Sequence, residues 1–210
     1  METEQIQNAN QKTDIELVDE TKQGNRKSFS ELVKRHQKNL LRLSLRFVKS
    51  LDLAEDIVQD SFIKAYEKLH SFEGRASFKS WLFQIAVNTA RNKLRETKRD
   101  TTDIDKVQVA VLAVAESNLV HSAIAAMIQE EVEKLPFKQK TALVLRVYED
   151  LSFKEIADVM ECPYDTAKAN YRHALLKLKE VFESKNDFKE ISFESQGFWL
   201  EMNQFVEAEG

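Results

Sequence analysis

The chain has 210 residues, of which 42% are hydrophobic and 31% charged, and its formal net charge is −4. This balance excludes an intrinsically disordered chain, and four glycines with two prolines are too few for a turn-rich all-β fold. A single cysteine, Cys162, excludes an internal disulfide and a thiolate metal cage. Composition therefore favours long helices joined by few loops. We expect a cytoplasmic protein with neither a signal peptide nor a transmembrane segment.

Hydrophobic periodicity predicts helix along most of the first half of the chain. The predicted helices cover about residues 14–23, 27–50, 52–69 and 78–99. Asp52, with Glu55 three residues later, matches an N-terminal capping pattern for the third helix, and Ser77 can cap the fourth. The stretch 70–76 contains Gly74 and is predicted to be a loop.

The second half begins with residues 100–115, which periodicity assigns to neither helix nor strand and which we predict to be a linker. Further helices are predicted at about residues 121–134, 137–149, 152–160 and 164–182. Ser152 followed by Glu155 repeats the capping-box pattern, and the break at 161–163 gives the last two helices a helix-turn-helix layout. The expected fold class is all-α, with two small helical domains joined by a linker.

Charge alternates along the chain. Residues 28–99 carry a net charge of +7 and residues 134–182 carry +2, whereas residues 100–133 carry −6 and residues 183–210 carry −5. Two basic segments, each followed by an acidic one, indicate two domains that face a polyanion, an acidic linker and an acidic tail.

The helix predicted at 78–99 is the first candidate nucleic-acid surface. A polar stripe lies between its two apolar sides and consists of Gln84, Asn88, Arg91, Arg95 and Lys98. Five cations fall within residues 91–99, more than the helix macrodipole requires, and guanidinium groups suit phosphates while amides suit base edges. Phe78 and Trp81 could stack on an unpaired base, although aromatic residues at such positions more often belong to the core.

The helix-turn-helix at 151–182 is the second candidate. Its last helix is predicted to bury Ala167, Tyr171, Ala174 and Leu178. The opposite side presents Thr166, Asn170 and His173, which can reach base edges, and it is flanked by Lys168 and Arg172, which suit phosphates. Asp165 in the first turn would repel a phosphate, and few cations face outward. Binding of duplex DNA by this element alone is therefore expected to be weak.

The two segments, in this order, resemble the extracytoplasmic-function (ECF) sigma factors of bacterial RNA polymerase, the two-domain class of the sigma-70 family. The first domain is carried by FSELV at 29–33, AEDIVQDSFIKAY at 54–66, FEGRASFKSWLFQIA at 72–86 and NTARN at 88–92. The second is carried by LP at 135–136 and LSFKEIA at 151–157, with Thr166 and Lys168 matching the recognition helix.

The resemblance implies a domain organisation. A disordered N-terminus, 1–13, precedes a helical bundle of sigma region 2 at 14–100, which contacts core polymerase and −10 DNA. A linker of acidic and apolar residues at 101–119 leads to the sigma region 4 helix-turn-helix at 120–183, which contacts −35 DNA. Beyond the usual end of the family, the residues themselves indicate an acidic, aromatic tail at 184–210, which is expected either to cap the second domain or to cover a basic surface or bind a regulator.

The resemblance also implies partners and site residues. The β′ clamp of core polymerase is expected on the helix at 52–69, at Glu55, Asp56, Gln59, Asp60, Phe62 and Ile63. Opened −10 DNA is expected at Gly74, Phe78, Trp81, Gln84, Asn88, Arg91 and Arg95. The −35 element is expected at Thr166, Lys168, Asn170, Arg172 and His173, although the family usually has Gly, Ser and Arg where this chain has Asp165, Ala169 and Asn170. The second domain is also expected to contact the polymerase β flap, and an anti-sigma factor to gate the protein, with no membrane insertion of this chain.

Two other functions stay open on the sequence alone. One is a stand-alone helix-turn-helix transcriptional regulator, which would bind palindromic half-sites as a dimer. The other is a sigma mimic that titrates an anti-sigma factor. An enzyme is not expected, and neither a catalytic residue, a metal nor a cofactor is predicted, because the four histidines are scattered and no glycine-rich phosphate loop occurs.

Overall fold

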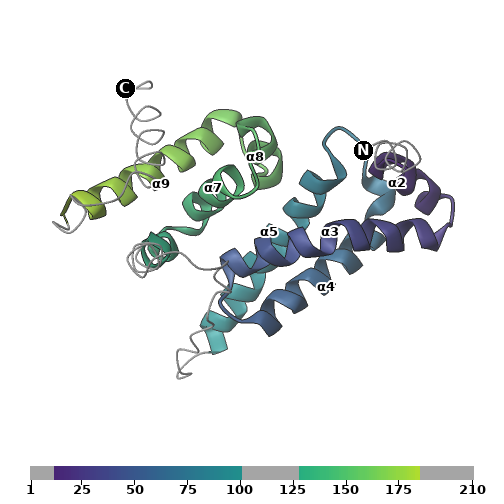
Figure 1. Ribbon diagram of the computed structural model, residues 1–210, viewed down its shortest axis with the longest axis horizontal. Helices are drawn as coiled ribbons and strands as arrows, with labels where there is room; N and C mark the ends of the chain where they lie inside the picture. Colours follow the sequence, from purple (N-terminus) through teal and green to yellow (C-terminus); the bar gives the residue numbers. More distant parts are fainter. Residues whose placement is uncertain (1–11, 101–127, 185–210) are drawn as a thin grey trace, which may run out of the picture. The chain divides into compact units, whose positions relative to one another are not determined.

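The computed structural model describes residues 12–100 and 128–184, and throughout these residues the secondary structure is helical, without strands (Figure 1). The chain divides into two compact units, 1–109 and 110–210. The predicted linker at 101–119, the start of the helix predicted at 121–134 and the tail from residue 185 lie outside the described residues. Among the helices that are described, none has an apolar stretch long enough to span a bilayer.

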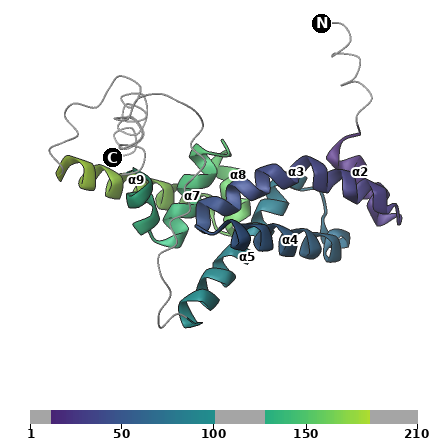
Figure 2. The ribbon, with the colours of Figure 1, turned by 60° about the horizontal axis from the view of Figure 1, so that its bottom comes forward.

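The helices of the first unit follow the predicted order. They are α2 (Asp14–Lys22), α3 (Arg26–Phe47), α4 (Leu51–Glu67), the short 3-10 helix η1 (Leu69–Ser71) and α5 (Phe78–Asp100). The long helix α3 packs against α2, α4 and α5, and it runs beside α4 in both views (Figure 1 and Figure 2). Its buried side is the predicted apolar stripe, in which Leu32, Leu40 and Leu43 are almost completely shielded from solvent.

Side-chain caps set where these helices begin. Thr13 and Glu16 form a capping box at α2, and Ser77 Oγ accepts the backbone N–H of Ser80 at 3.0 Å, as predicted for α5. The prediction that Asp52 caps α4 is wrong: Ser50 Oγ accepts the backbone N–H of Leu53 at 3.3 Å, so the helix begins at Leu51. Asp52 instead lies in the first turn, where the helix macrodipole favours a negative charge.

The second unit is a helical segment at 128–134 followed by α7 (Phe137–Val147), α8 (Phe153–Met160) and α9 (Tyr164–Ser184). Helix α9 packs on both α7 and α8. A core cluster fills the space between the helices and includes Val132, Leu135, Leu143, Ala174, Leu175 and Leu178. The capping box of Ser152 and Glu155 is confirmed, and α8 and α9 form the predicted helix-turn-helix.

The turn between α8 and α9 contains a residue in a left-handed backbone conformation. Glu161 has φ 50° and ψ 49° at the C-cap of α8, a conformation that costs little for glycine but about 1 kcal/mol or more for a residue with a Cβ. Glu161→Gly is therefore expected to stabilise the second unit by about 0.5–1 kcal/mol, after allowance for the greater freedom of glycine in the unfolded chain. Thermal unfolding followed by circular dichroism measures this gain. Glu161→Ala, which removes the carboxylate but keeps the Cβ, is expected to give none. An equal gain from both variants would assign the effect to the carboxylate.

Candidate functional site

The predicted polymerase-binding residues of α4 fall into three groups. The first group is exposed and consists of Glu55, Asp56, Gln59 and Ile63, of which Ile63 is 55% exposed. Asp60 is half-buried and turned toward α5, whereas Phe62 is only 7% exposed and packs edge-on against Phe29 at 6.4 Å. A partner can therefore reach the first group directly, and Phe62 supports that face from below.

One further side chain, Tyr66, extends this face. It follows Glu55, Gln59 and Ile63 at helical spacing, is 44% exposed, and its ring lies 4.9 Å from that of Phe29. Sequence reasoning missed it because a tyrosine three residues after an isoleucine is also the pattern of a buried stripe. Carboxylates beside two exposed apolar side chains form a surface that suits a basic partner with apolar contacts at its centre.

Two polar contacts fix α4 against α5. Asp60 and Lys93 form an ion pair at 3.2 Å, and Lys64 Nζ donates to Thr89 Oγ1 at 3.1 Å. Asp60, Lys64 and Lys93 are partly shielded from solvent, and Thr89 is buried. The acidic face of α4 and the basic stripe of α5 are therefore held in one arrangement within the first unit.

Three aromatic rings meet where the loop 72–77 enters α5. The ring centroids of Phe72 and Trp81 are 5.1 Å apart, and Phe78 lies 5.9 Å from each of them. Phe72 and Phe78 are buried, at 5% and 1% exposure, whereas Trp81 is half-buried. Trp81 is therefore the ring that a base can reach, with Phe72 and Phe78 as the support beneath it. Gly74, with φ 75°, gives the loop a left-handed turn that favours glycine.

The polar stripe of α5 continues from Trp81 along one side of the helix. Gln84 and Asn88 are half-buried, and Arg91 and Arg95 are exposed. Neither arginine forms an ion pair with another residue of the described part of the chain. The stripe thus offers two amides and two guanidinium groups, which are the groups that bind base edges and phosphates.

On α9 the predicted DNA-contacting residues differ in their exposure. Thr166 and His173 are exposed, and Lys168, Asn170 and Arg172 are half-buried. Asn170 Nδ2 donates to the backbone oxygen of Thr166 at 2.8 Å, and Arg172 Nε is buried without a hydrogen-bond partner in the described residues. A buried polar atom without a partner is uncommon in folded proteins.

Comparison with known families assigns each unit. Residues 32–100 match the family Sigma-70 region 2, and residues 125–178 match the family Sigma-70, region 4. The class of protein that these two matches define is the bacterial sigma factor. Among curated proteins, the chain is 35% identical over 188 residues to the ECF RNA polymerase sigma-E factor of Haemophilus influenzae, an alignment that covers 84% of this chain and 97% of that one. It is 34% identical to the RNA polymerase sigma-H factor of Pseudomonas aeruginosa, with 76% and 88% coverage. The chain belongs to the sigma-70 family, in its ECF group.

Two solved structures share the fold. CnrH, in complex with the cytosolic domain of CnrY, aligns with a TM-score of 0.61 at 22% identity, covering 81% of this chain and 97% of that one. The sigma factor RpoE of Bartonella quintana, in complex with the anti-sigma factor NepR, aligns with a TM-score of 0.61 at 25% identity, covering 75% and 98%. The all-α fold with two sigma domains is confirmed, and so is the function: as an ECF sigma factor, the chain directs RNA polymerase to promoters. Of the functions left open by the sequence, this is the one that the family supports.

Proposed function

We propose that the two units divide promoter recognition between them, with the domain limits expected from the sequence. The first unit, 14–100, docks on the β′ clamp through the exposed face of α4, which comprises Glu55, Asp56, Gln59, Ile63 and Tyr66. Asp60 and Phe62 contribute by holding that face in place, through Lys93 and Phe29 respectively. The observation that carries this proposal is that polar contacts hold α4 and α5 together. Binding of the clamp to α4 therefore brings α5 to the DNA.

The same unit receives the opened −10 strand on the loop 72–77 and α5. An unpaired base stacks on Trp81, whose ring rests on Phe72 and Phe78. Gln84 and Asn88 lie within reach of base edges. Arg91 and Arg95 lie within reach of the phosphates of the same strand. Gly74 lets the loop backbone approach the strand closely.

The second unit, 120–183, places α9 in the major groove of the −35 element and contacts the β flap. Thr166 and His173 face base edges, Lys168 and Arg172 bind phosphates, and Asn170 can exchange its bond to Thr166 for one to a base. Since Asp165 stands exposed in the first turn of α9, binding by this unit alone is expected to be weak. The unit therefore works as part of a holoenzyme.

An anti-sigma factor is the expected regulator. The Bartonella relative of this fold is bound to one, and here α4 exposes apolar side chains that a partner would cover. The anti-sigma factor is proposed to compete with polymerase for that face.

Promoter-dependent initiation by core polymerase, with and without the full chain, tests the proposed function. Activity is expected on duplex and pre-melted promoter templates in the presence of the chain, with duplex binding by the chain alone at least about tenfold weaker than by the holoenzyme. Tight, specific duplex binding without polymerase would instead favour a stand-alone regulator. Assembly with core but no initiation on either template would contradict the proposal.

A further inference from the structure

Helix α2 is linked to both ends of the loop that leads into α5, directly at the first end and through α3 at the second. At the first end, Lys22 Nζ donates a hydrogen bond of 2.7 Å to the backbone oxygen of Phe72. The same ammonium group lies 5.9 Å from the centroid of the Phe72 ring. A charged donor on a carbonyl is among the stronger hydrogen bonds in proteins, so Lys22 fixes where the loop begins.

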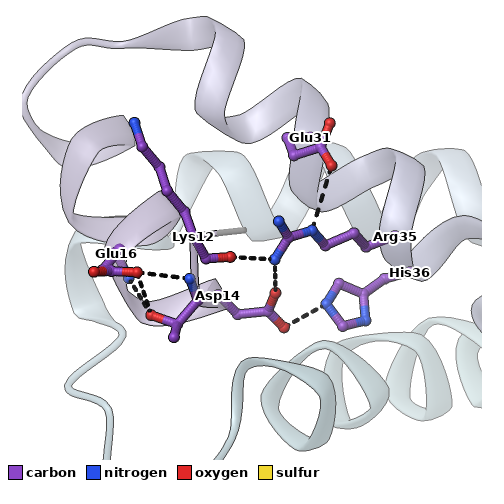
Figure 3. Close-up of polar contacts among 7 residues, drawn as sticks. Lys12, Asp14, Glu16, Glu31, Arg35 and His36 are labelled. Carbon is purple, nitrogen blue, oxygen red and sulfur yellow. Dashed lines mark hydrogen bonds and ion pairs between the residues drawn. The ribbon is translucent and has the colours of Figure 1, made fainter. Parts of the chain in front are cut away.

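At the second end, α2 acts through α3. Asp14 Oδ2 lies 2.6 Å from His36 Nε2, and Asp14 Oδ1 accepts a hydrogen bond of 3.1 Å from Arg35 Nη1 (Figure 3). Arg35 is held in turn by the backbone oxygen of Lys12, at 2.7 Å. The His36 side chain, in a residue only 8% exposed, faces Phe78 with ring centroids 5.3 Å apart. The carboxylate of Asp14 thereby orients the imidazole that packs against Phe78.

The two rings reached in this way are those beneath Trp81. Phe72 is linked to α2 by Lys22, and Phe78 by Asp14 through His36. We propose that α2 is a positioning element for capture of the opened strand, because Lys22 and Asp14 hold the two rings that set the position of Trp81. The inference rests on the proposed function, since it assigns these residues to the same base-stacking site.

The hydrogen bonds of Lys22 and Asp14 can fix the positions of Phe72 and Phe78 more precisely than apolar packing alone. Packing of rings is non-directional, whereas a hydrogen bond fixes both a distance and a direction. The other hydrogen bonds and ion pairs of the loop among the described residues are local: the Phe72 N–H donates to Leu69 O at 3.1 Å, the Ser80 N–H donates to Ser77 Oγ at 3.0 Å, and Arg75 pairs with Glu73 on the surface. A ring that is already in place when the strand arrives avoids the entropy cost of ordering it on binding.

The test uses the full chain assembled with core polymerase and the variant Lys22→Met, which keeps an apolar stem of similar length and removes the donor. Affinity for a fluorescent, pre-melted promoter is expected to fall by about fivefold to tenfold, with the affinity for core polymerase unchanged. Asp14→Asn is expected to act in the same direction, and Lys22→Arg to restore binding. Lys27→Met is the matched control. It removes the same charge as Lys22→Met, but Lys27 is exposed on α3 and does not contact the loop.

A second readout follows Trp81 itself. In a Trp199→Phe background Trp81 is the remaining tryptophan, and its fluorescence quenching by acrylamide reports how firmly the ring is held. Lys22→Met is expected to increase quenching, and Lys27→Met to leave it unchanged.

The possible outcomes separate the inference from the proposed function. If Trp81→Ala leaves promoter affinity unchanged, the base-stacking site itself is wrong. If Trp81→Ala weakens binding but Lys22→Met and Asp14→Asn behave like the Lys27→Met control, the positioning role of α2 is overturned. A loss of core polymerase affinity as large as the loss of promoter affinity would also overturn it, because α2 would then stabilise the whole unit.

Discussion

Asp56→Lys is expected to weaken assembly with core RNA polymerase by about tenfold to a hundredfold, which is the lower part of the range of coupling energies measured for close charge pairs across interfaces. Asp56 is exposed on α4 and forms no ion pair with the described residues, so the reversal breaks no contact within the unit. Fluorescence anisotropy of the labelled chain titrated with core polymerase measures the effect. The loss is expected to shrink at high salt, because screening reduces the repulsion that the new lysine introduces.

Asp60 is a poor position for the same experiment. Its ion pair with Lys93 ties α4 to α5, so reversal there would disturb the arrangement of the two helices as well as the face. Asp19→Lys is a better control, since Asp19 is an exposed aspartate on α2 outside the proposed face. Assembly that is unaffected by Asp56→Lys, or equally affected by Asp19→Lys, would contradict docking through α4.

Trp81→Ala is expected to lower the affinity of the holoenzyme for a pre-melted promoter by about fivefold to a hundredfold, because stacking on an aromatic ring is worth about 1–3 kcal/mol per base. Core polymerase affinity is expected to stay the same, since α4 carries that contact. Open complex formation, followed by the fluorescence of 2-aminopurine in the −10 strand, measures the loss on duplex templates.

Trp81→Phe separates stacking from stability in this experiment. Trp81 packs on Phe72 and Phe78, so truncation to alanine also removes packing within the unit. The phenylalanine variant keeps a ring on the same support and is expected to recover most of the affinity. An alanine variant that melts at a lower temperature yet opens promoters normally would argue against a stacked base.

Much of the site followed from sequence because helical periodicity places residues on faces. The polar stripe of α5 and the outer side of α9 lie where spacing predicted, with Arg91, Arg95, Thr166 and His173 exposed. Periodicity could not show which apolar residue at the stripe's edge is accessible. Phe78 and Trp81 share one side of α5 and both contact Phe72, but Phe78 also packs on His36 and is the buried member of the pair.

Contacts between residues of different helices could not be predicted from the sequence either, because periodicity describes one helix at a time. The pairing of Asp60 with Lys93 depends on the approach of α4 to α5, and that of Asp14 with His36 on the fold of α2 against α3. The start of α4 was misplaced for a local reason, because Ser50 and Asp52 are both good capping residues and the structure selects the earlier one.

The contacts of α2 bear on how the first domain should be isolated. The match to sigma-70 region 2 begins at residue 32, within α3, so a fragment trimmed to that match would lack Asp14 and Lys22. Such a fragment would keep the acidic face of α4 and the arginines of α5, yet leave His36 and the Phe72 carbonyl without the partners they have here. Expression boundaries for binding studies should therefore start upstream of Lys12, and a trimmed fragment that is inactive on single-stranded DNA would reflect the cut rather than the domain.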